Sequence, residues 1–340
     1  MTTIKDIARE AGVSVSTVSR VIAGHPDVSV RTAELVRGVI TKYHFTVNRN
    51  ARNLKQSETT TILVVIKGRR NVLFASMLEH VQAAVMPTGF TVTTQYVDED
   101  ANEVLEAERL VPEIKPRGVV FLGGNADNVT NNALRIGEPC PAVVLTNTVA
   151  KAGKPFISSV TTDDRRSARE AARYLIDRGH RNIGVIGGDP LCSPISNQRQ
   201  QGVLDALRES GIELNTATHC VETRFSLEAG YEAAESLVKT AQGITAIYAM
   251  SDMMALGAMR ALYDQGLRVP DDISLIGHDG VDLVTYVIPK LVTIRQPQQQ
   301  MAFRAIEILV DHIHGMSTPI EEFLEAEIVA GESVRTLVGR

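Results

Sequence analysis

Several charged and polar side chains of this 340-residue chain are placed where they could bind a ligand. They follow runs of apolar residues that predict buried strands. Asp279 follows ISLIGH, and Ser251 and Asp252 follow TAIYAM. Arg199 opens a predicted helix after the run NIGVIGG. Carboxylate and guanidinium groups form paired hydrogen bonds with hydroxyl groups. This set of side chains is therefore suited to holding a small polar ligand at the ends of strands.

Two phenylalanines and two further carboxylates belong with this set. Phe74 starts the first helix after residue 61, and Phe225 lies in a loop before the helical segment LEAGYEAAE. An aromatic face can stack on a sugar ring or on a planar base. Asp163 and Asp164 lie where the chain passes between two predicted sheets, and Asp164 could equally cap the next helix. Asp252 precedes MMALGAM, a position that favours a helix N-cap.

Motifs that would indicate an enzyme or a metal site are missing. No predicted strand is followed by GxGxxG, and the chain contains no GxxxxGK[ST], HExxH or nucleophile elbow. The cysteines Cys140, Cys192 and Cys220 are too scattered for a disulfide framework or a metal knuckle, and we expect reduced thiols. The sequence therefore predicts no catalytic residues, no metal and no cofactor.

Two similar series of alternating strands and helices must position the ligand candidates. Apolar runs at TILVVI, GVVFLGG and AVVLTN alternate with helical patterns, and the same order returns in the second half of the chain. This alternation predicts a body of two lobes, each built on a doubly wound parallel sheet, with a hinged cleft between them. The expected lobes are residues about 61–160 with 292–320, and about 162–290 with 321–340. A strand at LVTIRQP, a helix over 298–314 and a strand pair near 322–330 and 332–337 are expected to end the body.

The first 46 residues predict a small all-α head. A helix over 4–11, a left-handed stop at Gly12 and a helix over 15–21 capped by Ser14 form a helix-turn-helix. A third helix is expected to follow Ser29 and to complete a small apolar core. The fold class is thus a helix-turn-helix head followed by a two-lobed α/β body.

Charge is divided unequally between these parts. Residues 1–60 carry a net charge of +4, whereas residues 61–340 carry −9, although the whole chain is only −5. Residues 47–60 are polar and basic and predict a linker. The basic part can approach phosphates, and the acidic body would be repelled by them. The chain shows no secretory segment and no apolar run long enough to span a bilayer, so we expect no membrane partner and a cytoplasmic location.

Long stretches of the chain resemble the LacI family of bacterial transcription regulators. The stretch TIKDIAREAGVSVSTVSRVIAGHPDVSVRTAELV is similar to the helix-turn-helix head of that family. The body resembles it in RGHRNIGVIGG, SDMMALGAMRALYDQGLRVPDDISLIGHD, LVTIRQP and GESVR. The resemblance covers essentially the whole chain. It implies a periplasmic-binding-protein-like body, a homodimer, a palindromic operator and a repressor controlled by a small-molecule effector.

The resemblance assigns roles in DNA binding to particular residues. It places Val15, Ser16 and Arg20 at the base edges of the major groove. The fork of Arg20 matches the two acceptors of guanine, and Val15 can contact a thymine methyl group. Near phosphates or in support, the resemblance places Thr17, Ser19, His25 and Asn48.

The linker gains a role by the same resemblance. Residues 49–55 match the hinge helix of the family, which forms on the operator. Leu54 would be the apolar wedge in the minor groove, with Ala51 beside it. Val47 stands where many members of the family have proline. The implied organisation is a head over 1–46, a hinge over 47–60 and a body over 61–340.

The resemblance also selects among the ligand candidates. The family binds its effector at the positions of Phe74, Arg199, Phe225 and Asp279, and we carry over Asp163 and Ser251 with them. A carbohydrate is the expected effector. A nucleoside or purine would suit the two phenylalanines, and Arg69 and Arg70 would suit a sugar phosphate. A sugar-binding protein or an enzyme is a remote alternative.

Overall fold

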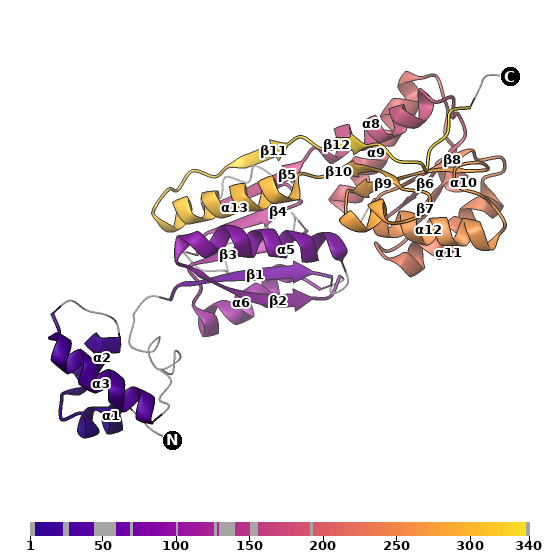
Figure 1. Ribbon diagram of the computed structural model, residues 1–340. Coiled ribbons are helices and arrows are strands. Elements are labelled where there is room, and N and C mark those ends of the chain that lie inside the picture. The colour runs from indigo at the N-terminus through magenta and orange to yellow at the C-terminus, as the bar shows by residue number, and fades with distance from the viewer. Residues whose placement is uncertain are drawn as a thin grey trace. The chain divides into compact units, whose positions relative to one another are not determined.

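The computed structural model describes most of the chain as two compact units, Met1–Thr59 and Thr60–Arg340. The described residues are 4–22, 27–43, 59–68, 71–99, 101–125, 128, 140–149, 156–190 and 193–337. Figure 1 labels the elements of both units.

The first unit contains the three helices that the sequence predicts. Its apolar core includes the fully buried side chains of Ile7, Val18 and Val36, one from each helix. Gly12 has a φ of +64°, and Ser14 caps the second helix by accepting a hydrogen bond from the backbone of Thr17. The helices are α1 (Ile4–Glu10), α2 (Val15–Ile22) and α3 (Val30–Lys42). The predicted helix-turn-helix is therefore confirmed.

The second unit begins with a six-stranded parallel sheet in the order β11-β5-β4-β3-β1-β2. Alternate residues of β1 face opposite layers, so Val64 packs with α5 and Leu63 packs with α6. The strands are β1 (Thr61–Lys67), β2 (Thr91–Val97), β3 (Gly118–Leu122), β4 (Ala142–Leu145), β5 (Ile157–Thr162) and β11 (Glu321–Leu324). The accompanying helices are α5 (Val72–Val85), η1 (Met86–Thr88), α6 (Glu103–Ile114) and α13 (Gln298–Ile313).

A second six-stranded sheet has the order β12-β10-β9-β8-β6-β7. Helices α8 and α9 pack together, and α11 and α12 form another packed pair (Figure 1). The strands are β6 (Ile183–Gly187), β7 (Cys220–Glu222), β8 (Ala246–Ala249), β9 (Ser274–Asp279), β10 (Val292–Arg295) and the antiparallel β12 (Glu327–Val329). The helices are α8 (Asp164–Ile176), α9 (Pro194–Glu209), α10 (Thr216–His219), α11 (Leu227–Thr240), α12 (Asp252–Asp264) and η3 (Asp282–Thr285).

The end of the chain is threaded differently from the prediction. Strand β10 pairs with β9 and so belongs to the second sheet, whereas β11 pairs with β5 in the first sheet. The predicted lobes are therefore corrected at β10 and β11, whereas α13 packs against the first sheet and β12 pairs in the second, as predicted. The expected strand at 332–337 is also wrong, because the Ser333 hydroxyl ties this segment to Leu275 and Val292 without a ladder.

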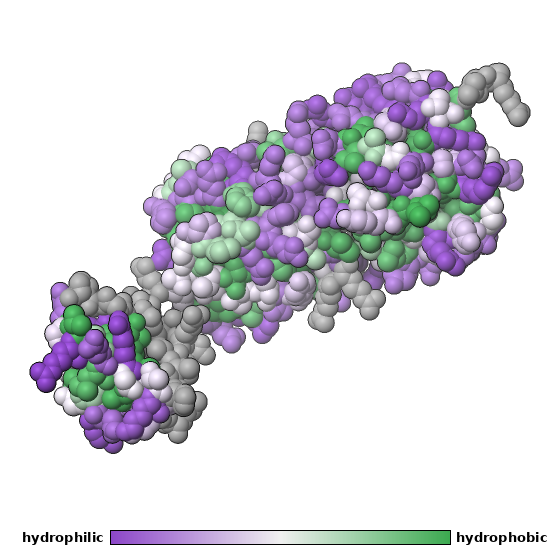
Figure 2. Space-filling model, in the orientation of Figure 1, coloured by the Kyte–Doolittle hydropathy of each residue, from purple (hydrophilic) through white to green (hydrophobic). Residues whose placement is uncertain are grey.

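The surfaces of both units are mixed in character. Figure 2 shows hydrophilic side chains over much of the visible face of each unit, with smaller hydrophobic areas between them. Among the described residues, no helix is long and apolar enough to cross a membrane.

Candidate ligand site and DNA-binding head

A cavity of about 300 Å³ in the second unit is lined by segments at the carboxyl ends of strands from both sheets. Of the predicted effector residues, Phe74, Arg199, Phe225 and Asp279 line it together. Side chains that the prediction did not include also line it, among them Lys67, Leu73, Glu99, Asn125, Thr146, Asn147, Asp189, Ser193, Thr223, Arg224 and Gln296.

Each of the two phenylalanines is supported by a glycine at a strand end. Gly123 follows β3 with a φ of +73°, and a Cβ atom there would overlap the ring of Phe74. Gly188 follows β6, and a Cβ atom there would lie 2.8 Å from the ring of Phe225. The two glycine-rich turns therefore make room for the aromatic rings that line the cavity.

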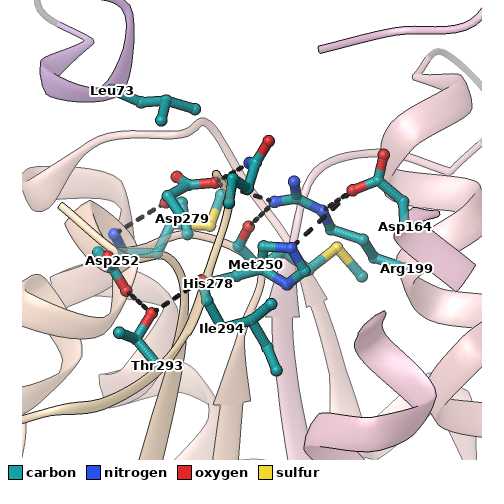
Figure 3. Close-up of polar contacts among 12 residues, drawn as sticks. Leu73, Asp164, Arg199, Met250, Asp252, His278, Asp279, Thr293 and Ile294 are labelled. Atoms are coloured by element: carbon teal, nitrogen blue, oxygen red, sulfur yellow. Dashed lines mark hydrogen bonds and ion pairs between the residues drawn. The ribbon is translucent and has the colours of Figure 1, made fainter. Parts of the chain in front are cut away.

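Arg199 lies at the centre of the buried polar groups, with 4% of its surface exposed. Its Nε donates a hydrogen bond of 2.7 Å to Asp164, and its Nη1 contacts the carbonyl oxygen of Met250. Nη1 also lies 3.5 Å from Oδ1 of Asp279 (Figure 3). Burial opposes the charge on Arg199, but the two carboxylates outweigh burial and raise its pKa. The guanidinium is therefore held as a fixed cation in the wall of the cavity.

Asp279 ends β9 in an unfavourable backbone conformation, with a φ of +116°. Gln296 Nε2 donates a hydrogen bond of 2.9 Å to its Oδ1. Burial raises the pKa of Asp279 to about 6, and the nearby Arg199 offsets part of that rise. This carboxylate can therefore change its protonation state near neutral pH, which an exposed aspartate would not do.

Ser251 and Asp163, both predicted effector residues, do not line the cavity. Ser251 is the N-cap of α12, where its hydroxyl accepts from the backbone of Met254. Asp163 is the exposed N-cap of α8 and accepts from the backbone of Arg166. A side chain that turns back onto its own helix is not directed at a ligand.

The next residues in the chain, Asp252 and Asp164, do not cap these helices. The predicted N-cap at Asp252 is wrong: its carboxylate is buried and accepts from the backbone of Val281 and from the hydroxyl of Thr293. Burial raises its pKa well above the usual range. Asp164 likewise does not cap α8 and instead pairs with Arg199.

His278 lies beneath this cluster and is fully buried. Its Nδ1 shares a hydrogen bond of 2.9 Å with the hydroxyl of Tyr248. Its Nε2 lies 3.9 Å from Oδ1 of Asp164 and has no hydrogen bond among the described residues (Figure 3). Burial lowers the pKa of His278 well below its ordinary value, so the ring is neutral.

Besides the predicted Phe74, the first lobe contributes polar residues to the cavity that the sequence reasoning missed. Lys67 pairs with the buried Glu103 at 3.0 Å. Asn147 donates a hydrogen bond to the carbonyl oxygen of Gly124. Thr146 has a φ of +69°. The signal was available, because polar residues also follow the runs TILVVI, FLGG and AVVL of the first lobe.

The head presents the predicted DNA-contacting residues on one helix. Val18 and Val21 of α2 are buried, and the predicted contact residues Val15, Ser16, Ser19 and Arg20 are exposed, with Thr17 partly so. The remaining predicted contacts lie outside the described residues: His25, Asn48, Ala51 and Leu54. Arg69 and Arg70, the basis of the sugar-phosphate alternative, also lie outside them.

Comparison with known proteins identifies the family. Residues 3–48 match the model for bacterial regulatory proteins of the lacI family, and residues 172–334 match the periplasmic binding protein-like domain. The transcriptional regulator MalR of Clostridium butyricum is 36% identical over 333 residues, which cover 97% of this chain and 98% of that protein. Catabolite control protein A of Priestia megaterium is 32% identical over 92% of each chain.

Solved structures agree with these sequence matches. A Lac repressor dimer bound to operator, 23% identical, has the same fold with a TM-score of 0.83 over 98% of this chain and 99% of the other. The regulator CelR in complex with cellobiose, 27% identical, gives a TM-score of 0.73 over 98% of this chain and all of the other. The relatives are named as regulators and repressors, in agreement with the prediction of a regulator rather than an enzyme. The chain therefore belongs to the lacI family of bacterial regulatory proteins.

Proposed function

We propose that this regulator is a homodimeric repressor whose affinity for a palindromic operator is controlled by a neutral saccharide bound in the cavity of the body. A dimer would bring two heads to half-sites related by a dyad. Because the operator is chromosomal DNA, the protein would act in the cytoplasm. The observation that carries the proposal is the buried pair of Arg199 and Asp279 in a cavity that two phenylalanines also line.

The charges around the cavity favour a neutral ligand over a phosphate. The described lining contains three cationic side chains, Lys67, Arg199 and Arg224, and three carboxylates, Glu99, Asp189 and Asp279. Two more carboxylates stand immediately behind it, since Lys67 pairs with Glu103 and Arg199 with Asp164. A phosphate would therefore meet cations whose charge is already balanced, whereas ring hydroxyls would find both donors and acceptors.

The names of the relatives support a sugar and leave a second candidate. CelR was solved with cellobiose, and a ribose-bound regulator from Enterococcus faecium is 24% identical with a TM-score of 0.70. The purine and nucleoside alternative rests on Phe74 and Phe225, which could stack on a planar base. Repressors named PurR and CytR are 32% and 29% identical to this chain.

In the head, we propose that α2 reads the major groove with Val15, Ser16 and Arg20, supported by Thr17 and Ser19. The exposure of these side chains supports that role. His25, Asn48, Ala51 and Leu54 are proposed contacts from sequence resemblance alone. The head over 1–46, the hinge over 47–60 and the body over 61–340 are the corresponding functional parts.

The test uses the full-length chain and an operator that the chain itself selects from random duplex DNA. Operator affinity is measured by fluorescence anisotropy without and with cellobiose, maltose, ribose, glucose, adenosine or hypoxanthine. At least one neutral saccharide at saturation is expected to change operator affinity about tenfold, a coupling of typical size. A response to adenosine or hypoxanthine alone would select the second candidate. Unchanged operator affinity with all six compounds would overturn the proposed control.

A further inference from the structure

His278 is a buried titratable residue to which the proposed ligand site assigns no role. It belongs to β9, one position before Asp279, and no part of it is exposed to solvent. Its ring contacts the hydroxyl of Tyr248 on β8 through Nδ1 and faces the carboxylate of Asp164 through Nε2. This Nε2 has no hydrogen bond among the described residues (Figure 3). A buried polar atom without a partner requires an explanation.

The contacts of the ring determine which of its nitrogens carries the proton. The ring is neutral, because burial lowers its pKa well below the ordinary value, so one nitrogen is protonated and the other is not. The hydroxyl of Tyr248 is also fully buried, and among the described residues it bonds only to Nδ1 of His278, at 2.9 Å. A buried hydroxyl needs an acceptor for its hydrogen. Tyr248 therefore donates to Nδ1, and the proton of the ring lies on Nε2.

The opposite tautomer of His278 would be unfavourable at both ends of the ring. With the proton on Nδ1, the hydroxyl of Tyr248 would accept, and its own hydrogen would lack an acceptor among the described residues. The lone pair of Nε2 would then face Oδ1 of Asp164 at 3.9 Å, and two electron-rich atoms repel each other strongly in a buried setting. Tyr248 and Asp164 thus select the same tautomer, in which the Nε2–H faces the carboxylate.

Asp164 connects this ring to the ligand site. Its Oδ1 accepts the hydrogen bond of 2.7 Å from Nε of Arg199, and the same oxygen faces Nε2 of His278. Burial raises the pKa of Asp164, and Arg199 opposes that rise. The separation of 3.9 Å between Nε2 and Oδ1 is longer than a hydrogen bond, so the N–H acts as an oriented dipole. In a site of low dielectric, such a dipole favours the ionised carboxylate.

We infer that His278 is a positioning residue of the ligand site, which keeps Asp164 ionised and thereby fixes the guanidinium of Arg199 in the cavity wall. This inference rests on the proposed function and adds to it a residue that does not itself line the cavity. If Asp164 took up a proton, Asp279 would remain as the ionised partner of Arg199. A ligand would then have to compete with the guanidinium for that carboxylate.

Two substitutions of His278 separate the roles of its two nitrogens. Glutamine reaches about as far as Nε2, so His278→Gln retains a donor towards Asp164. Asparagine is shorter and places its amide near the position of Nδ1, so His278→Asn leaves no donor facing the carboxylate. His278→Asn is expected to weaken saccharide binding about fivefold, the value of one net hydrogen bond, and His278→Gln to bind within about twofold of the wild type.

His180→Asn is the matched control for the loss of a buried imidazole. His180 is another fully buried histidine of the same lobe, and its ring nitrogens bond to the hydroxyl of Thr245 and to the carbonyl oxygen of Arg335. It does not line the cavity. This variant is expected to lower Tm and to leave saccharide affinity unchanged.

The experiment uses the full-length chain with isotope-labelled histidine and arginine. NMR of the free protein reports which nitrogen of His278 is protonated and how fast the Nε–H of Arg199 exchanges with solvent, and His278→Gln and Arg199→Lys identify the two signals. The Arg199 Nε–H is expected to be protected in the wild type and in His278→Gln, and to exchange about tenfold faster in His278→Asn. Calorimetry with cellobiose, maltose, ribose and glucose measures affinity, and thermal unfolding measures Tm.

The outcomes distinguish this inference from the saccharide proposal. A proton on Nδ1 of His278 in the wild type would overturn the inference, and so would equal protection of the Arg199 Nε–H in the two His278 variants. Affinity losses that follow Tm alone, in His180→Asn as in His278→Asn, would also overturn it, and in all three cases the saccharide proposal stands. If the wild type binds none of the four saccharides, that proposal fails, and the NMR measurements still decide whether His278 positions Arg199.

Discussion

Arg199 keeps its charge in a buried position because carboxylates surround it. Asp164 and Asp279 both lie within ion-pair distance, and the carbonyl oxygen of Met250 accepts from the same guanidinium. Burying three such groups is costly unless each is paired. In these ion pairs the charge of Arg199 is already balanced by Asp164 and Asp279. The affinity of a ligand that binds Asp279 should therefore change when the charge of any of these groups changes.

The raised pKa of Asp279 predicts weaker saccharide binding at low pH. A carboxylate accepts hydrogen bonds from ligand hydroxyls at both oxygens, and protonation near pH 6 removes part of that capacity. Affinity is expected to fall about tenfold between about pH 7.5 and about pH 5, as one pH unit below the pKa requires. Calorimetry at both pH values measures it. Asp279→Asn is the control, expected to bind weakly at both, and a flat wild-type profile would contradict the prediction.

The same shift predicts the opposite trend for the stability of the free protein. The pKa of Asp279 is raised on folding, so its contribution to the free energy of unfolding is fully present below the ordinary value near 3.8. That contribution is lost as the pH rises through about 6. Urea unfolding of wild type and Asp279→Asn across this range should show a steeper decline in the wild type, because the variant keeps only the contributions of the other buried carboxylates, such as Asp252. Parallel stability profiles would count against the raised pKa.

Ser251 offers a test of capping against ligand binding. Its hydroxyl accepts from the amide of Met254 at the start of α12. Ser251→Ala is expected to lower the free energy of unfolding by about 1 kcal/mol and to leave saccharide affinity unchanged. Asp163→Ala, which removes the cap of α8, is the companion variant with the same expectation. A tenfold loss of affinity in a folded Ser251→Ala protein would show that Ser251 contacts the ligand.

At the scale of elements, the turns after β3 and β6 determine where the aromatic rings lie. Gly123 and Gly188 each occupy a position where a side chain would collide with a phenylalanine. The positive φ of Gly123 adds a conformational requirement to that steric one. The aromatic part of the cavity therefore depends on two residues that have no side chain.

Gly123→Ala is expected to displace Phe74 and to weaken saccharide binding at least tenfold. The added methyl group would overlap the ring, and the φ of +73° would cost about 1 kcal/mol for alanine. Gly89→Ala is the matched control, because Gly89 has a φ of +80° and no atom within 4 Å of the position a Cβ would take. Both variants should lose similar backbone stability, and only Gly123→Ala should lose affinity. Equal affinities in calorimetry would contradict this account.

Most elements were predictable from the pattern of apolar residues. A continuous apolar run predicts a strand that is buried on both faces, and helical periodicity predicts a helix that is buried on one face. Strand β5 escaped prediction because its sequence, ISSVTT, carries buried hydroxyls. Ser158 there is bonded to His312 and to the backbone of Ile320, partners more than 150 positions away. The threading of β10 and β11 was mispredicted for a related reason. Their pairing depends on distant strands, which local sequence does not reveal.

The candidate site was predictable to the extent that strand ends identify ligand residues. That rule placed Phe74, Arg199, Phe225 and Asp279 in one cavity. It could not decide between adjacent residues such as Asp163 and Asp164, because a shift of one position determines which carboxylate caps the helix and which meets Arg199. It also could not reveal strained backbone, which arises only when neighbouring strands fix the chain.

At the scale of the whole molecule, charge separates the two tasks of the chain. Residues 1–60 carry +4 and residues 61–340 carry −9. Because phosphate contacts dominate the affinity of DNA-binding proteins, this division of charge favours the proposal that residues 1–60, and not the acidic body, contact DNA. The figure of −5 for the whole chain conceals this division.

Within the body, two of the three chain crossings between the sheets bear on the cavity. Asp164 begins α8 just after β5 leaves the first sheet, and it holds Arg199. Gln296 follows β10, just before α13 packs against the first sheet, and it holds Asp279. The third crossing joins β11 to β12. A ligand on Arg199 and Asp279 would thus lie one hydrogen bond from two of these crossings, which are the kind of connecting segment that acts as a hinge when two lobes move.

Gln296→Met should therefore weaken the coupling between saccharide and operator. Methionine approximates the length of glutamine and removes the amide that binds Asp279. Gln300→Met, at an exposed position of the following helix α13, is the matched control. Operator affinity is measured without and with saturating saccharide, and saccharide affinity without and with operator. Because coupling between two binding sites is reciprocal, both ratios should fall by the same factor in Gln296→Met and stay at the wild-type value in Gln300→Met. If both ratios kept their wild-type values in Gln296→Met, the coupling would have to depend on other residues of the cavity. If the operator ratio and the saccharide ratio differed from each other, the two ligands would not act on one shared equilibrium.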